Sequence, residues 1–364
     1  MPIRSIAAAL AFSALAPSLA PSLAFGGDAP DFQSVGALEF GPQGVLFVAD
    51  PQAATIYALE TADTEAPEGE RGLDVEKIDA KLAYMLGTTP DEIRIHDLAV
   101  NPLSRAAYLS LTRGGGDGAQ HAIVRVESSE KVELLDFEEL GFMAFPIDNA
   151  PQPDESGPRS KRTQSITDMV FHEGFLYVAG LSNEEFASKL RALEFPFENA
   201  GPRASTGTSI EVYHASHDAW ETRSPVRAFV PIDIAGDPHL LCGYTCTPLV
   251  KVPIEGIRAA KKFTGTTVAE LGNRNTPLDM VVYEKGGERF VLIANTSRGV
   301  MKLPTAGIEG AEGMTELVRE PAGMGYETIA ALANVTQLAP LDGEHALVLI
   351  EAEGGSSLER IELP

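Results

Sequence analysis

The sequence predicts an all-β protein folded as a six-bladed β-propeller, and three observations support this fold class. The 364 residues include 34 glycines and 25 prolines, which suits many short strands joined by tight turns. The stretch Gly44–Glu60 (GVLFVADPQAATIYALE) alternates in hydrophobicity, breaks at Asp50-Pro51 and resumes as a second strand. Variants of this unit recur along the chain at intervals typical of four-stranded propeller blades.

The strands can be assigned blade by blade. The third strands are the most similar to one another, since Cys246–Ile257 and Ser297–Ile308 are near-copies. The central strands are predicted at Leu46–Ala49, Ala107–Leu111, Phe175–Ala179, His239–Gly243, Phe290–Ala294 and Ala346–Ile350. The innermost strands are predicted at Ala37–Phe40, Asp97–Val100, Asp168–Phe171, Asp279–Tyr283, within Ala228–Ile234 and at Val335–Ala339.

Ring closure needs one more strand. The chain ends in the third strand of the last blade, Leu358–Leu363, and an open blade would expose a strand edge. We therefore expect a strand within Gly27–Val35 to close the ring.

Two insertions between strands read as helices. Asp79–Leu86 is predicted as a short helix that ends at Gly87. Ser182–Leu193 begins with a capping box formed by Ser182 and Glu185, and its apolar residues then follow helical spacing.

The N-terminus has the pattern of a secretory signal peptide. Arg4 supplies the positive start, Ile6–Leu19 the apolar segment, and Ser22-Leu23-Ala24 the small residues before a cut. We expect residues 1–24 to be removed and residues 25–364 to form a single exported domain, periplasmic or extracellular. No later segment reaches transmembrane length, so stable membrane insertion is not expected.

The chain is strongly acidic, with a formal net charge of −24. Binding to nucleic acid or to an anionic membrane surface requires a basic patch. The charge therefore argues against both kinds of partner.

The strand pattern of Gly44–Tyr57, repeated in Phe171–Leu181, resembles blades of NHL-type and SMP-30/gluconolactonase-like six-bladed propellers. This resemblance implies the propeller fold and suggests one alternative function, metal-dependent hydrolysis of the lactonase type. None of that group's metal ligands can be matched to a position in this sequence.

Propeller topology predicts which loops share a face. The longest insertions fall in loops that enter innermost strands or join central to third strands, and these loops emerge together. Asp97, Asp168 and Asp279 each begin an innermost strand, so we expect them at one channel mouth. They could form a Ca²⁺-like oxygen site with Asn295 or Glu184, transfer a proton, or bond backbone amides of their own turn or of the next blade.

Four arginines are predicted around the same mouth. They could clamp an anionic ligand, or they could neutralise the aspartates, in which case no metal is required. These residues are Arg113, Arg162, Arg274 and Arg298.

The two cysteines, Cys242 and Cys246, have three interpretations. In an exported chain an even count predicts a disulfide, but they could also be buried free thiols. Their spacing resembles that of copper-handling Sco-type proteins, which suggests a periplasmic copper or redox role. His214 and His217 are expected in an exposed hairpin.

Three functions therefore remain open. We favour a non-catalytic exported propeller that binds a small molecule or a protein segment at the loop-rich face of the channel. The alternatives are a metal-dependent hydrolase of the lactonase type, with a Ca²⁺-like ion, and a periplasmic copper- or redox-associated protein.

Overall fold

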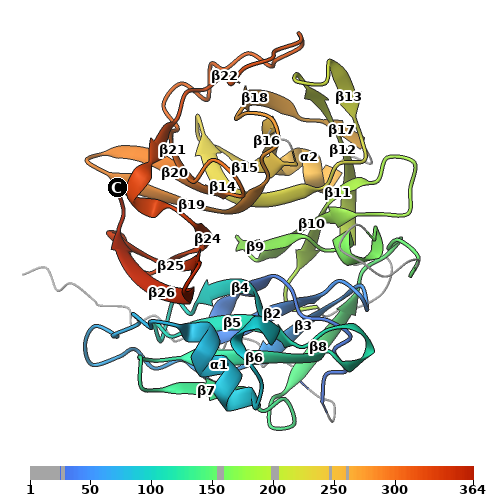
Figure 1. Ribbon diagram of the computed structural model, residues 1–364. Coiled ribbons are helices and arrows are strands. Elements are labelled where there is room, and N and C mark those ends of the chain that lie inside the picture. Colours follow the sequence, from blue (N-terminus) through green and yellow to red (C-terminus); the bar gives the residue numbers. More distant parts are fainter. Residues whose placement is uncertain (1–24, 26–28, 154–159, 198–204, 246–247, 260–261) are drawn as a thin grey trace, which may run out of the picture.

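The computed structural model describes residue 25 and residues 29–153, 160–197, 205–245, 248–259 and 262–364, so the predicted signal peptide, residues 1–24, lies outside the described residues. Six β-sheets form a closed ring within these ranges, which confirms the six-bladed β-propeller (Figure 1). No helix of the described residues has the length and apolar composition needed to cross a bilayer.

The blades are numbered in chain order, and each starts at its innermost strand. Blade one contains β1 (Leu38–Phe40), β2 (Val45–Asp50), β3 (Thr55–Glu60) and β8 (Phe142–Pro146). Blade two contains β4 (Ile93–Val100), β5 (Ala107–Arg113), β6 (Gln120–Val126) and β7 (Val132–Leu134). Blade three contains β9 (Asp168–His172), β10 (Phe175–Leu181), β11 (Ser188–Glu194), β12 (Ser205–His214) and β13 (Ala219–Glu221), with β17 (Lys262–Thr264) beside β12.

The second half of the chain forms the other three blades. Blade four contains β14 (Val226–Ile234), β15 (Asp237–Tyr244), β16 (Pro248–Pro253), β18 (Thr266–Glu270) and β22 (Ala322–Gly323). Blade five contains β19 (Pro277–Lys285), β20 (Glu288–Asn295), β21 (Val300–Pro304) and β23 (Glu327–Ile329). Blade six contains β24 (Val335–Pro340), β25 (His345–Ala352) and β26 (Gly355–Glu362).

The blades are not arranged around the ring in chain order. Each of the six core clusters fills one interface between two neighbouring blades. These interfaces give the ring order two, one, three, four, five, six, with blade six packed against blade two. Blade two therefore lies between blades one and six. The chain leaves blade one after β3, builds blade two, and returns to add β8 to the outer edge of blade one.

The predicted closure by a strand within Gly27–Val35 is wrong for its described part, since residues 29–35 form no strand and residues 27–28 lie outside the described residues. Blade six has three strands in the described residues, and its edge is covered by Val75, which exchanges two backbone hydrogen bonds with Leu358 (2.9 and 3.0 Å). Val75 belongs to the linker between blades one and two. The N-terminal segment instead follows blade one, where the Ser34 hydroxyl donates to Asp50 (2.6 Å). The linker closes the ring because its apolar side chains are buried between blades two and six.

One of the two predicted helices is present. α1 (Ile78–Leu86) agrees with the prediction and ends at Gly87, which is left-handed (φ 66°). The predicted helix Ser182–Leu193 is wrong, because β11 occupies its second half and nearly every β11 residue is buried. A strand packed on both faces loses the polar alternation that identifies strands in a sequence. The short helix α2 (Ile254–Ala259) was not predicted.

Candidate functional site in the axial channel

The innermost strands β1, β4, β9, β14, β19 and β24 line an axial cavity of about 460 Å³. Its lining includes Asp97, Asp168 and Asp279, so the structure brings the three predicted aspartates to one space. The cavity extends from the aspartates to the turns after β4 and β24, where Arg105 lies. Those turns are at the opposite end of the innermost strands from the loops predicted to hold the site.

Each aspartate bridges two blades. The innermost strand is the edge of its sheet, so some of its backbone N–H groups have no strand partner. One carboxylate oxygen of each aspartate accepts such an N–H from the innermost strand of a neighbouring blade. The pairs are Asp97 with Leu38 (2.6 Å), Asp168 with Phe229 (2.9 Å) and Asp279 with Leu338 (2.6 Å).

The order of blades explains the spacing of these bridges. The aspartates come from blades two, three and five, which is irregular along the chain. In ring order, two-one-three-four-five-six, they occupy every second blade, and each bonds the blade that follows it. The predicted alternative, in which each aspartate bonds a backbone amide of the next blade, is the arrangement observed.

A fourth acid, Glu39, is not among the site residues predicted from the sequence. It lies in the middle of β1 and lines the same cavity, where its Oε1 atom accepts the Phe171 N–H (2.9 Å). This bond joins blade one to blade three. A single acid inside the apolar run Leu38–Phe40 was the signal that could have identified it.

The four acids are surrounded by protein, and part of each side chain's surface faces the cavity. Desolvation raises the pKa of Glu39 to about 8 and that of Asp97 to about 7, against the opposing effect of backbone N–H donors. Burial and then the neighbouring Asp97 carboxylate hold the pKa values of Asp168 and Asp279 well above their usual range.

No cationic side chain of the described residues forms an ion pair with these four acids. Arg227, on β14, interacts electrostatically with Asp168 without pairing with it, and burial lowers the pKa of this guanidinium. Arg105 is the one arginine or lysine among the described residues of the lining, so acid groups outnumber basic ones in this cavity.

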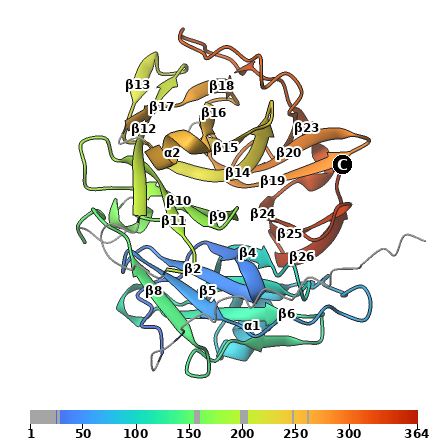
Figure 2. The same cartoon turned by 180° about the vertical axis from the view of Figure 1, so that it is seen from behind.

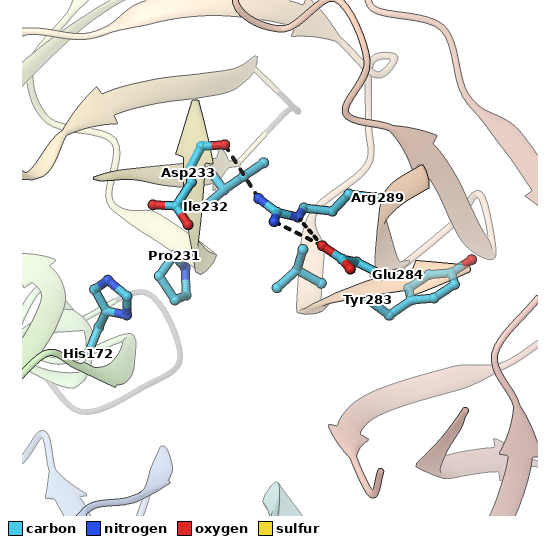
Figure 3. A pocket seen from close by; sticks show the side chains of 8 residues that line it. His172, Pro231, Ile232, Asp233, Tyr283, Glu284 and Arg289 are labelled. Carbon is cyan, nitrogen blue, oxygen red and sulfur yellow. Dashed lines mark hydrogen bonds and ion pairs between the residues drawn. The ribbon is translucent and has the colours of Figure 1, made fainter. Parts of the chain in front are cut away.

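A second cavity of about 260 Å³ adjoins the first one. Figure 3 shows its lining, in which Arg289 lies between Glu284 and Asp233, while His172 lies apart from them beside Pro231. Arg289 donates to Glu284 (3.0 Å from Nη2) and to the Asp233 carbonyl oxygen (3.5 Å). Pro231 and Val282 line both cavities, so this rim of mixed charge continues into the acidic channel.

Asn295 and Glu184, predicted as further metal ligands, lie elsewhere. Asn295 is buried and bonds the Asn275 side chain (2.9 Å), while Glu184 pairs with Lys189 (2.6 Å). The three channel aspartates do not form a compact group of ligand atoms. Among the described residues, the one group of three whose ligand atoms all lie within 4.8 Å of one another is His214, His217 and Glu221.

The four predicted arginines do not line the cavity. Arg113 donates to Gln120 (2.7 Å), Arg162 to the Gln52 carbonyl (2.7 Å) and Arg298 to the Asn273 carbonyl (3.4 Å), and Arg274 occupies a left-handed turn position (φ 57°). None of them pairs with a channel aspartate, so they do not neutralise these groups. Their predicted role as an anion clamp stays a prediction.

Cys242, on β15, is fully buried between blades three and four, bonds no other cysteine of the described residues, and has a pKa that burial raises. Cys246 lies outside the described residues, so the disulfide stays a prediction. A raised thiol pKa opposes the thiolate form that copper binding requires.

Known proteins show only a distant likeness to this chain. No family model and no curated protein matches the chain. Similar solved structures include the PQQ-bound aldose sugar dehydrogenase from Streptomyces coelicolor, at 14% identity and TM-score 0.34, covering 92% of this chain and 96% of that one. A soluble aldose sugar dehydrogenase from Escherichia coli in the apo form has 12% identity and TM-score 0.31, covering 91% and 96%.

A chain of a mitotic checkpoint complex has 10% identity and TM-score 0.38, covering 98% of this chain and 99% of that one. Similarity at these values has no implication for activity or ligand. The resemblance to NHL and SMP-30-like blades is supported at the level of the propeller, and the narrower grouping stays a prediction.

Proposed function

We propose that this protein is a binding propeller that takes a small ligand with a positively charged group, an amine or a guanidinium, into the axial cavity. The observation that carries this proposal is the set of four acids, Glu39, Asp97, Asp168 and Asp279, which line one cavity and form no ion pair. Placing carboxylates in a protein interior without a counter-charge is unfavourable. A cationic ligand would supply the missing charge.

The cavity also fits a ligand of this class in size and lining. Its volume of about 460 Å³ falls within the usual range for small-molecule sites. Apolar side chains, including Met169, Met280 and Leu338, line the same space and would contact the aliphatic part of an alkylamine. Each acid is held in place by a backbone N–H, so little side-chain entropy would be lost on binding.

This function makes binding dependent on pH. A cation binds the ionised carboxylates more tightly than the neutral acids, so the acids must release protons as the ligand enters. With the pKa of Glu39 near 8 and that of Asp97 near 7, affinity should rise between about pH 5 and about pH 8. The pattern of residues 1–24 further supports the proposal that binding takes place outside the cytoplasm.

The test measures the binding of three small probes to the mature chain by calorimetry and thermal shift. Agmatine and spermidine are cationic, and glucose is uncharged. We expect a cationic probe to bind at about pH 8 and at least ~10-fold more weakly at about pH 5, because the carboxyl groups are then protonated. Glu39→Gln should weaken binding, whereas Asp91→Asn, which removes an exposed acid, should not.

Failure of both cationic probes to bind the wild-type chain, or equal binding by Glu39→Gln, would count against this function. Added Ca²⁺ distinguishes the alternative of a metal-dependent hydrolase. Stabilisation by Ca²⁺ that is lost in Asp279→Asn, without binding of either amine, would favour that alternative.

A further inference from the structure

A cluster of two histidines and two glutamates lies away from the axial channel, where the outer strands of blades three and four meet. His214 ends β12, His217 lies in the turn and Glu221 ends β13, while Glu270 ends β18 of the next blade. Figures 1 and 2 both place the β12–β13 hairpin at the periphery of the ring near β18. The sequence predicts an exposed hairpin here, but His214 is only 1% exposed.

The hairpin register brings the three ligand-type side chains together. His214 pairs with Ala219 and Val212 with Glu221, which puts His214 and Glu221 diagonally opposite on one face of the ribbon. The Nδ1 atoms of His214 and His217 both contact Glu221 Oε1, at 2.9 and 2.6 Å. Two imidazoles therefore converge on a single carboxylate oxygen.

This spacing is close to that of a bound metal ion. Ligand atoms about 2.1 Å from a tetrahedral Zn²⁺ ion lie about 3.4 Å from one another. The atoms of His214, His217 and Glu221 already lie within 4.8 Å of one another, so side-chain adjustments are sufficient to coordinate an ion. His217 and Glu221 keep exposed side-chain surface (50% and 25%), which provides an entry path and a position for a water ligand.

A second observation points to a ligand in the same place. Glu270 is 2% exposed, and its Oε2 atom, which has no hydrogen-bond partner, lies 3.9 Å from His214 Nε2. The other oxygen of Glu270 accepts the Ala215 N–H (2.7 Å), so this carboxylate also fixes the backbone of the turn. In metal sites a carboxylate commonly orients a ligating histidine through its other ring nitrogen.

We propose that His214 Nδ1, His217 Nδ1 and Glu221 bind one Zn²⁺ ion, with Glu270 acting as a positioning residue. When Nδ1 binds the metal, the His214 ring carries its proton on Nε2. This N–H then donates a hydrogen bond to Glu270 Oε2 or to the Ser216 hydroxyl, whose oxygen lies 2.8 Å from Nε2. Imidazole and carboxylate donors favour Zn²⁺ over Ca²⁺ or Mg²⁺, which prefer oxygen alone.

The test measures Zn²⁺ binding to the mature chain, produced without a polyhistidine tag, by calorimetry. Co²⁺ serves as a spectroscopic probe, since its visible absorption reports coordination by nitrogen and oxygen ligands. The chain contains one tryptophan, Trp220, next to Glu221, so quenching of its fluorescence by Cu²⁺ locates the ion. His217→Gln is the main variant because that side chain is 50% exposed, so its replacement should leave the fold unchanged.

We expect one equivalent of Zn²⁺ to bind to the wild-type chain, and His217→Gln and Glu221→Gln each to weaken it at least ~10-fold. Glu270→Gln should weaken binding by ~10- to 100-fold without changing the stoichiometry, as expected of a residue that positions a ligand. His239→Gln is the matched control, because that histidine bonds only a nearby carbonyl in the described residues. No Zn²⁺ binding, or equal binding by His217→Gln and the control, would overturn the proposal.

Discussion

Glu39→Gln should stabilise the protein at neutral pH, although it removes an ionisable group from the proposed site. Glutamine keeps the carbonyl oxygen that accepts the Phe171 N–H, so the bridge between blades one and three is retained. It also has nearly the shape of a protonated glutamate. The substitution therefore removes the ability to ionise and little else.

The size of the effect follows from the pKa of Glu39, which burial raises from 4.5 to about 8. Between these two values the unfolded chain has released the proton and the folded chain keeps it, so stability falls as pH rises. Stability from this group is fully present below about pH 4.5 and is lost as pH rises towards 8. The difference amounts to about 3 kcal/mol at pH 7, and we expect roughly 2 kcal/mol because Glu39 is only partly shielded from the cavity.

Urea unfolding at a series of pH values measures this effect directly. The free energies of unfolding of Glu39→Gln and wild type should differ by under ~1 kcal/mol near pH 5 and diverge towards pH 7, with the variant more stable. Asp91→Asn removes the same charge from an exposed position and controls for the change in net charge. Parallel curves for wild type and Glu39→Gln would refute the assignment of a buried, protonated acid.

Two further substitutions test the bridges and the ring closure. Asp279→Asn should lower the free energy of unfolding by ~1–3 kcal/mol even at about pH 5. Both carboxylate oxygens of Asp279 accept a backbone N–H, and an asparagine would turn its NH₂ group towards one of these two donors. Equal stability of this variant and wild type would contradict the bridge. Val75→Pro removes the N–H that bonds blade six and should cost ~2–3 kcal/mol in the same assay, whereas Glu65→Pro, in the exposed part of the same linker, should stay within ~0.5 kcal/mol. A small effect of Val75→Pro would show that the ring closes by other contacts.

The blade count and most strands could be predicted because the repeating unit is local. Alternation in Gly44–Glu60, the turn at Asp50 and the helix stop at Gly87 depend on neighbouring residues alone. The order of blades could not be predicted in this way, since it depends on which distant apolar surfaces pack together. Val75 closes blade six because the linker is buried between blades two and six, and no local pattern distinguishes that from a solvated loop.

The candidate site was predicted in part for the same reason. Equivalent positions in the repeat identified Asp97, Asp168 and Asp279, and the ring then brings them together whatever the order of blades. Glu39 has no equivalent acid in another blade, so alignment of the repeats could not find it. The proposed zinc site depends on Glu270 meeting a hairpin of a different blade, which is a tertiary contact.

The four acids of the axial cavity are present for different physical reasons. Asp168 and Asp279 each accept backbone N–H groups on both oxygens, and such bridges account for their presence without any ligand. Glu39 accepts one backbone N–H, and its raised pKa makes it a net cost to stability at neutral pH. A residue that lowers stability is expected where it serves binding. If the axial cavity binds a cation, Glu39 should therefore contribute more to affinity than to folding, and the aspartates should show the reverse.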